Sequence, residues 1–172
     1  MDSDNVKIEV ITDLAAAPGW IDMKREYLNY AVAKHKEVTG QTVDAEDQLR
    51  QTVEHIDEFL GPKGRFIVAR TAENELLGMV LLFRLANGKG EIKRLYVHPK
   101  ARRKGLAKRL MEKLELEAKQ MGCSALYLDT SAGLKEAIAF YRSLGFDDAP
   151  FDPTSVQSPE IAKYLVIMEK AL

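Results

Sequence analysis

The chain contains 172 residues, enough for one compact domain and too few for two of ordinary size. Hydrophobic residues make up 46% and charged residues 30%, a balance typical of a globular protein and not of a disordered one. The 25 lysines and arginines nearly match the 26 aspartates and glutamates, and the net charge of -1 argues against a chain that coats nucleic acid or an anionic membrane. We therefore expect a single domain over residues 1–172, with no nucleic-acid or membrane partner.

The cysteine count and the N-terminal sequence restrict the sites and compartments to expect. The single Cys123 excludes an intrachain disulfide and a cysteine-ligated zinc site. The three histidines show no metal-ligand spacing, and no apolar run approaches the ~20 residues that span a bilayer. The sequence M-D-S-D at the N-terminus lacks the basic and then apolar order of a signal peptide. We expect a cytoplasmic protein without a metal.

The N-terminal third predicts one strand and then two helices. Residues 7–12 alternate between apolar and polar side chains, which is typical of a strand. Between Pro18-Gly19 and Thr39-Gly40, apolar residues recur at helical spacing. A second helix is expected from about Asp44, with one apolar face formed by Leu49, Val53, Ile56 and Leu60.

The middle of the chain predicts three strands in succession. They cover residues 66–69, 76–85 and about 91–97. A polar turn at 72–75 separates the first two, and N-G-K-G at 87–90 is a hairpin signal because Asn and Gly tolerate positive φ.

The C-terminal half predicts alternating helices and strands. We expect helices at about 103–121 and 134–144, each followed by a glycine that ends it, and strands at 125–128, from Phe146, and at 161–168. The three prolines between residues 147 and 159 predict a loop. In this loop Asp147, Asp148 and Asp152 are expected to be solvated turn residues, and the alternative is that they attract a cationic amine. Hairpins combined with one strand–helix–strand crossover predict an α/β or α+β sheet flanked by helices.

Basic residues are concentrated at one predicted strand-to-helix junction. Between His98 and Arg109 there is no acid, and the six basic residues are Lys100, Arg102, Arg103, Lys104, Lys108 and Arg109. Gly105 falls in the first turn of the predicted helix, where the missing side chain lets a ligand approach the backbone. Helix N-termini and basic side chains bind phosphate. The pattern predicts a phosphate or pyrophosphate site at residues 102–107, and the alternative is a solvated basic helix start.

Two sequence blocks resemble those of the GCN5-related N-acetyltransferase superfamily. The run L-Y-V-H-P at 95–99, followed by R-R-K-G-L-A at 102–107, is similar to its acetyl-CoA signature Q/R-x-x-G-x-G/A. The run A-I-A-F-Y-R-S-L-G-F at 137–146 is similar to its later A-x-x-F-Y-x-x-x-G-F block. The resemblance covers a coenzyme-binding core at about residues 64–147. It implies a mixed, mostly antiparallel sheet of about six to seven strands, splayed between the fourth and fifth strands near residues 126–128.

The resemblance also implies how acetyl-CoA, or coenzyme A, is bound as the cosubstrate. Backbone amides of residues 103–107 would cradle the pyrophosphate, and the backbone of Leu95 and Val97 would pair with the pantetheine as a neighbouring strand does. The Leu95 amide would also stabilise the oxyanion that forms on the thioester carbonyl. The coenzyme-binding residues implied are Leu95, Tyr96, Val97, Arg102, Arg103, Lys104, Gly105, Leu106, Ala107, Lys108, Thr130 and Tyr141.

Two side chains are candidates for proton transfer. A lysine-like amine with a pKa of about 10.4 is mostly protonated at pH 7, so acetyl transfer needs a proton acceptor. Glu91 lies four residues before Leu95, the offset of the catalytic glutamate in histone-acetyltransferase members of the superfamily; the alternative is a strand-start charge. Tyr141 matches the tyrosine that often acts as general acid for the departing thiolate; the alternative is a core tyrosine.

One position departs from the family pattern. Leu134 stands where many relatives have an asparagine that contacts the coenzyme, so this contact is lost or is supplied by Thr130 or Ser131. We expect Trp20 and Tyr27 to be core residues, although the first two helices commonly form the acceptor wall in this superfamily.

The leading hypothesis is an N-acetyltransferase that transfers an acetyl group from acetyl-CoA to a primary amine of a small molecule or protein. The transfer would occur by direct attack in a ternary complex, in a monomer or homodimer. One rival is an acyl-CoA-binding regulatory module without turnover. Another is a nucleic-acid-binding domain that uses the basic patch at 98–109.

Overall fold

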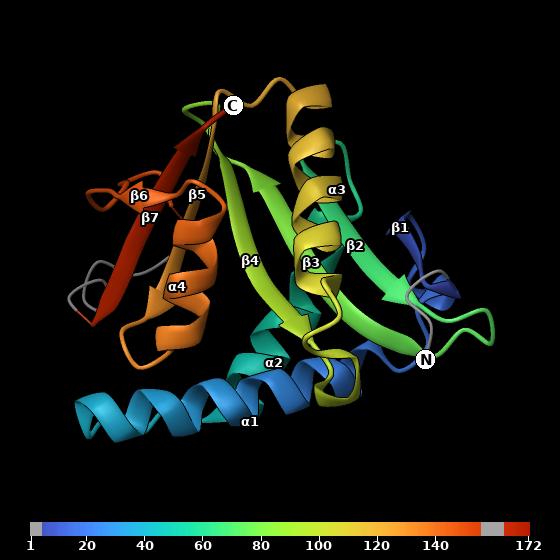
Figure 1. Ribbon diagram of the computed structural model, residues 1–172, viewed down its shortest axis with the longest axis horizontal. Coiled ribbons are helices and arrows are strands. Elements are labelled where there is room, and N and C mark those ends of the chain that lie inside the picture. The colour runs from blue at the N-terminus through green and yellow to red at the C-terminus, as the bar shows by residue number, and fades with distance from the viewer. Residues whose placement is uncertain (1–4, 156–163) are drawn as a thin grey trace.

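A mixed sheet forms the centre of the protein (Figure 1). The computed structural model describes residues 5–155 and 164–172. Within these residues, seven strands hydrogen-bond in the order β1-β2-β3-β4-β5-β7-β6. They are β1 (Lys7–Ile11), β2 (Gly64–Arg70), β3 (Leu76–Arg84), β4 (Gly90–Val97), β5 (Ala125–Ser131), β6 (Asp147–Asp148) and β7 (Leu165–Ala171). All neighbours are antiparallel except β4 and β5, which confirms the predicted fold class.

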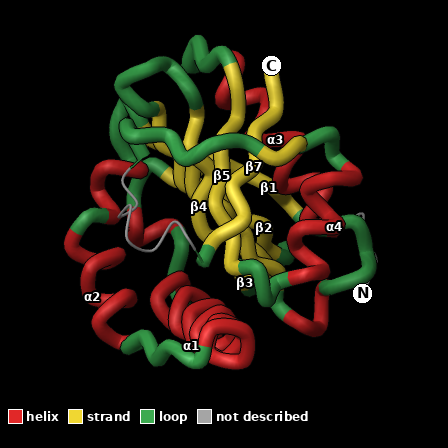
Figure 2. The backbone as a smooth tube through the Cα atoms, turned by 90° about the vertical axis from the view of Figure 1, so that its left-hand side faces the viewer, coloured by secondary structure: helices red, strands yellow, loops and turns green. Residues whose placement is uncertain are grey.

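Helices cover both faces of the sheet, as Figure 2 shows in side view. Two lie on one face and two on the other: α1 (Trp20–Thr39) and α2 (Ala45–Glu54), then α3 (Leu106–Gln120) and α4 (Lys135–Ser143). On the α1 face Trp20 is buried and packs edge-on against Phe66, with 5.9 Å between ring centroids. On the α3 face the core includes Leu110 and Leu114. The sheet therefore separates two apolar cores.

Strands β4 and β5 diverge after a short paired stretch. Residues 90–92 pair with residues 126–128, and the parallel ladder ends there. We call the space between residues 93–97 of β4 and 129–131 of β5 the β4–β5 splay (Figure 1). The predicted splay is confirmed, but its predicted position is wrong, because residues 126–128 are where the two strands are joined.

A bulge in β4 accounts for the divergence. On β3, Met79 pairs with Tyr96 and Leu81 pairs with Lys93, so one residue of β3 faces two residues of β4. One of these two is Arg94, whose φ of 59° lies in the left-handed region. A bulge bends its strand and increases the local twist, so β4 turns away from β5 just after residue 92.

The second predicted helix is shorter than expected. Helix α2 ends at Glu54, and a separate 3-10 turn follows at Ile56–Phe59. Val53, predicted to lie on the apolar face, is 38% exposed, whereas Ile56 is buried. The backbone at His55 is not helical. The residues before and after it therefore do not share one helix face, as the predicted spacing required.

Two other boundaries also differ from the prediction. Helix α3 begins at Leu106 and not at 103, because Arg103 and Gly105 have φ values of 60° and 74°. Strand β7 extends to Ala171, beyond the expected end at 168. The predicted start of that strand at 161–163 and the end of the preceding loop lie outside the described residues.

The expectation that Asp152 is a solvated turn residue is wrong. Its side chain is buried and accepts hydrogen bonds from Asn87 Nδ2 at 2.7 Å and from Thr154 Oγ1 at 2.7 Å. Lys89 Nζ lies 3.2 Å from the same carboxylate. Asp152 therefore ties the loop after β6 to the β3–β4 hairpin.

Candidate active site

The turn that leads into α3, residues 102–108, has free backbone amides; we call it the α3 entry turn. Arg109 N donates to Gly105 O at 3.1 Å, which is the first helical hydrogen bond. The amides of residues 106–108 therefore have no helical acceptor. Gly105 is exposed, and an added Cβ would meet nothing within 4 Å. These features suit a diphosphate, which helix N-termini bind through backbone amides.

The Arg102 side chain points away from the free amides. Its Nε donates to Val97 O at 2.9 Å, and its guanidinium lies 5.5 Å from the Tyr30 ring centroid and 5.6 Å from that of Tyr96. Arg102 thus fixes the end of β4 against α1, and only its backbone remains at the α3 entry turn.

The other basic residues of the patch divide into two groups. Arg109 donates to Val6 O at 2.8 Å, and Lys100 pairs with Glu75. Arg103, Lys104 and Lys108 are exposed at the entry turn itself. These last three side chains and the helix N-terminus therefore place positive charge directly at the turn, and the charge of Arg109 adds to it.

The β4 edge that faces the splay fits a strand-like ligand. Residues 93–97 have β3 on one side and no partner strand on the other among the described residues. An extended pantetheine arm could hydrogen-bond this edge, as added strands do elsewhere. Leu95 and Val97, predicted to make these contacts, both lie on this edge. The residues present therefore fit coenzyme A at both its diphosphate and its pantetheine.

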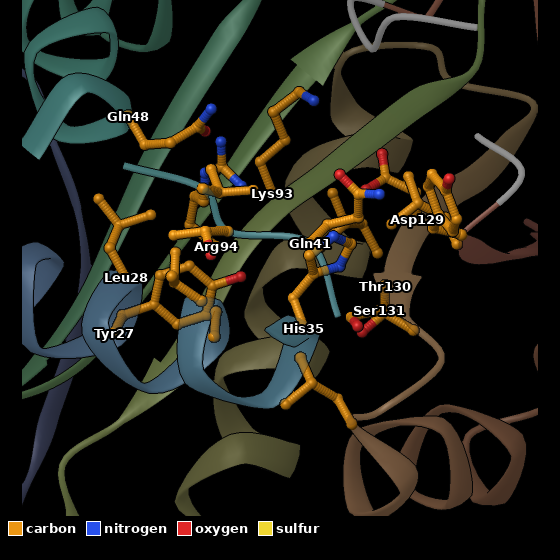
Figure 3. Close-up of a pocket in the computed structure, with 18 residues that line it drawn as sticks. Tyr27, Leu28, His35, Gln41, Gln48, Lys93, Arg94, Asp129, Thr130 and Ser131 are labelled. Atoms are coloured by element: carbon orange, nitrogen blue, oxygen red, sulfur yellow. The ribbon is translucent and has the colours of Figure 1, made fainter. Parts of the chain in front are cut away.

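A pocket of about 250 Å³ opens on the α1 side of the splay (Figure 3). Helix α1, the loop at 41–43, β4 and β5 all contribute to its wall. Figure 3 shows Lys93 and Arg94 on one side of the pocket and Asp129 on the other. Thr130 and Ser131, the proposed substitutes for the missing asparagine, line the same pocket as Leu134.

Glu91 lies near this pocket but is not part of its wall. Its side chain is fully buried, and its Oε1 accepts a hydrogen bond from Ser155 Oγ at 2.5 Å. Lys93 Nζ, which belongs to a wall residue, lies 3.3 Å from the same oxygen. The second oxygen, Oε2, is buried with no hydrogen-bond partner among the described residues. Glu91 can therefore accept a proton at Oε2.

Tyr141 belongs to the core on the α3 face of the sheet. Its ring lies 5.7 Å from those of Phe140 and Phe146. Burial raises the pKa of its hydroxyl, and the nearby Tyr27 and Asp129 raise this pKa further. Tyr141 itself is not among the residues that line the pocket. It stays protonated at neutral pH and can act as an acid.

Three residues of this region were missed or misplaced by the sequence analysis. Tyr27, expected in the core, lines the pocket, and its ring lies 5.9 Å from that of Tyr96. Asp129 lines the pocket too, and the alternation along β5 could have placed it on the same face as Tyr127. Lys24 is 1% exposed on the buried stripe of α1, and its position between Trp20 and Leu28 could have revealed it.

Other residues singled out by type lie outside the pocket. Cys123 is buried, and burial raises the pKa of its thiol. The His98 side chain accepts a hydrogen bond from Lys100 N at 3.3 Å and so caps the short 3-10 turn at Pro99–Ala101. Among the described residues, no group of three His, Cys, Asp or Glu could hold a metal. No helix in that part of the chain has both the length and the apolarity needed to span a membrane.

The sequence matches the model of the Acetyltransferase (GNAT) family over residues 25–146. The chain belongs to this family. It is therefore an acyltransferase, and the resemblance in the two sequence blocks is confirmed.

Individual relatives agree with this assignment. The chain is 34% identical over 127 residues to the IAA acetyltransferase of Azospirillum brasilense, covering 63% of this chain and 83% of that protein. Its fold is similar to that of a GNAT-family acetyltransferase from Staphylococcus aureus, with a TM-score of 0.75, 20% identity, and coverage of 97% and 99% of the two chains. The PaiA N-acetyltransferase of Thermoplasma acidophilum, solved in complex with coenzyme A, has a TM-score of 0.72 at 22% identity, with coverage of 97% and 99%.

Proposed function

We propose that this GNAT acetyltransferase transfers the acetyl group of acetyl-CoA to a primary amine by direct attack in a ternary complex. The observation that carries the proposal is the β4–β5 splay. It connects the free amides of the α3 entry turn, at the end of β4, with the pocket beside residues 92–94 and 129–131. One ligand can therefore be held along β4 while a second enters the pocket.

Coenzyme A would be held mainly by backbone groups. The amides of residues 103–107 would bind the diphosphate, with Arg103, Lys104 and Lys108 supplying positive charge. The exposed edge of β4 at Leu95 and Val97 would pair with the pantetheine. When bound, acetyl-CoA supplies the thioester whose carbonyl carbon the amine attacks and whose sulfur leaves. The Leu95 amide would stabilise negative charge on the carbonyl oxygen.

Asp129, Glu91 and Tyr141 would each have a role in binding the protonated amine or in transferring a proton. Asp129, in the pocket wall, would attract the protonated amine and orient it. Glu91 would accept the amine proton through one bridging water at Oε2, which has no hydrogen-bond partner among the described residues, while its Oε1 lies 3.3 Å from Nζ of the wall residue Lys93. Tyr141 would give its proton to the departing sulfur and so prevent the thiolate from attacking in reverse.

An assay of coenzyme A thiol release tests the proposal. Purified protein is mixed with acetyl-CoA and a panel of primary amines that includes amino acids, alkylamines and lysine peptides. We expect thiol release that depends on the amine, together with one acetyl group gained by that amine in mass spectrometry. Binding of acetyl-CoA without thiol release for any amine would instead indicate a regulatory module.

The same assay can separate direct attack from an acetylated enzyme. In direct attack no protein nucleophile is needed, so protein incubated with labelled acetyl-CoA alone should retain no label. The matched variant Cys123→Ser should keep the wild-type rate, because this buried thiol lies outside the pocket wall. Stoichiometric labelling of the wild-type protein, lost in Cys123→Ser, would contradict direct attack.

A further inference from the structure

We propose that the acceptor amine carries a carboxylate, which binds where Lys24, Lys93 and Arg94 converge at one end of the pocket. The acceptor class is thus amino acids and related amino-carboxylic acids. This inference rests on the proposed function, because it names the substrate class of that same pocket.

Lys24 is the first observation that requires an explanation. Its Nζ is buried and has no hydrogen-bond partner among the described residues. Its one favourable contact there is with the face of the Tyr27 ring, 5.1 Å from the centroid. A buried lysine amine without a counter-ion is costly to protonate, and strongly perturbed groups of this kind cluster at functional sites.

The neighbours of Lys24 increase this cost. Burial lowers the pKa of Lys24, and the positive charges of Arg94 and Lys93 lower it further. Arg94 projects from the β4 bulge, and no described residue forms an ion pair with it. Lys93 contacts a single described carboxylate, that of Glu91. Among the described residues, these three basic side chains thus have one carboxylate between them, that of Glu91.

An anion would resolve this imbalance. Lys93 and Arg94 both line the pocket, and so do Tyr27 and Leu28, the residues one turn along α1 from Lys24. A carboxylate at this end could accept hydrogen bonds from the fork-shaped Arg94 guanidinium and from Lys93. Its negative charge would also stabilise the protonated form of Lys24 beneath the wall.

The opposite end of the pocket has the opposite charge. Asp129 lies there, across the pocket from Lys93 and Arg94 (Figure 3), and has no ion-pair partner among the described residues. A molecule with an amine at one end and a carboxylate at the other therefore matches both ends. The volume of about 250 Å³ lies near the lower limit for small-ligand pockets. Diamines and polyamines, which lack an anion, match only one end.

The test compares the binding of matched ligands and does not depend on turnover. Calorimetry measures the affinity of the coenzyme A complex for three pairs: L-phenylalanine and 2-phenylethylamine, L-leucine and 3-methylbutylamine, and 4-aminobutyrate and propylamine. We expect the carboxylated member of at least one pair to bind about tenfold or more tightly, and spermidine to bind no better than propylamine. The absence of any such preference, whether both members bind alike or neither binds, would overturn the inference.

Two variants locate the preference within the pocket. Arg94→Gln and Lys24→Met should each reduce the ratio of the two affinities about tenfold, towards one. The matched controls Arg50→Gln and Lys119→Met change exposed residues outside the pocket and should keep the wild-type ratio. Folding of each variant is checked by its affinity for coenzyme A, which binds along the splay. A preference that survives both Arg94→Gln and Lys24→Met would place the carboxylate elsewhere and contradict this assignment.

The two proposals fail in different ways. If acetyl transfer fails but the carboxylated ligands still bind preferentially, the anion end is correct and the enzymatic proposal is wrong. If alkylamines and polyamines are acetylated at the same rate as amino acids, the enzymatic proposal holds and the assignment of an anion-binding end is wrong.

Discussion

At the scale of single residues, burial decides which side chains can perform chemistry here. Tyr141 is buried among aromatic rings, and that burial raises its hydroxyl pKa far above neutral. A phenol with a raised pKa keeps its proton at physiological pH, but it is also a weaker acid, so burial makes the proton available without making its transfer easier. Core packing and general-acid catalysis are therefore compatible for this residue, although the sequence presented them as alternatives.

Removing only the Tyr141 hydroxyl tests its proposed role. Tyr141→Phe keeps the ring and its packing, so we expect the folded state and the KM values to be retained. The value of kcat should fall by about a hundredfold, because the departing sulfur loses its proton donor. Steady-state kinetics with the best amine measures both constants. Tyr30→Phe, which removes an exposed phenol outside the pocket, is the control, and an unchanged kcat in Tyr141→Phe would remove this residue from the mechanism.

The sequence could identify some site residues and not others. Glu91 and Tyr141 were found because they occupy fixed offsets in two sequence blocks, and their roles stay predictions. Lys24 and Asp129 have no such block around them. Their importance depends on their surroundings in space. Lys24 is buried without a hydrogen-bond partner among the described residues, and Asp129 lines the pocket. A single sequence does not show that arrangement.

At the scale of elements, local backbone conformation determines where the site opens. The strands, hairpin and helices were largely predictable, because hydrophobic periodicity and glycine turns mark them. The bulge of β4 was not, because an arginine carries no sequence signal for a left-handed φ. The position of the splay depends on this bulge, and for that reason it was misplaced by a few residues.

Asp152 is a second element-scale feature that the sequence did not show. It connects the loop after β6 to the β3–β4 hairpin through Asn87, Lys89 and Thr154. Burial opposes the ionisation of Asp152, but hydrogen bonds from Thr154, Asn87 and Lys89 outweigh it and lower the pKa to about 2. The charged carboxylate is therefore part of the folded structure.

Asp152→Asn should destabilise the protein in a pH-dependent way. At pH 7 we expect the free energy of unfolding to fall by about 1–3 kcal/mol, because charge-assisted hydrogen bonds are lost. The pKa is lower in the folded than in the unfolded protein, so the wild-type advantage is present above about pH 4 and is lost as the pH falls towards 2. Denaturant unfolding of both proteins between pH 2 and 7 measures this difference.

A matched substitution in β6, just before this loop, provides the control. Asp148→Asn removes an exposed carboxylate that pairs with Arg142 at 2.9 Å, and exposed ion pairs contribute little. We expect a change within about 0.5 kcal/mol. An equal loss in Asp148→Asn and Asp152→Asn, or a difference that does not depend on pH, would contradict the role given to Asp152.

At the scale of the whole molecule, one sheet links elements from both ends of the chain. β1 lies at one edge, and β7 and β6 lie at the other. This continuity supports our prediction of a single domain. The net charge of -1 also acquires a structural meaning. The net charge is small because acidic residues elsewhere on the molecule balance the positive charges of the α3 entry turn and of the Lys93 and Arg94 end of the pocket.

The most direct test of the account is the affinity for acetyl-CoA of two glycine variants, measured by calorimetry. Gly105→Glu places a carboxylate over the free amides of the α3 entry turn. Gly19→Glu is its match, because Gly19 also precedes a helix with positive φ and open space at its Cβ. Both variants therefore carry similar backbone strain. We predict that Gly105→Glu weakens binding by about tenfold or more while Gly19→Glu binds as the wild type does. Equal affinity in all three proteins would contradict an acetyl-CoA site at the start of α3 and along the splay.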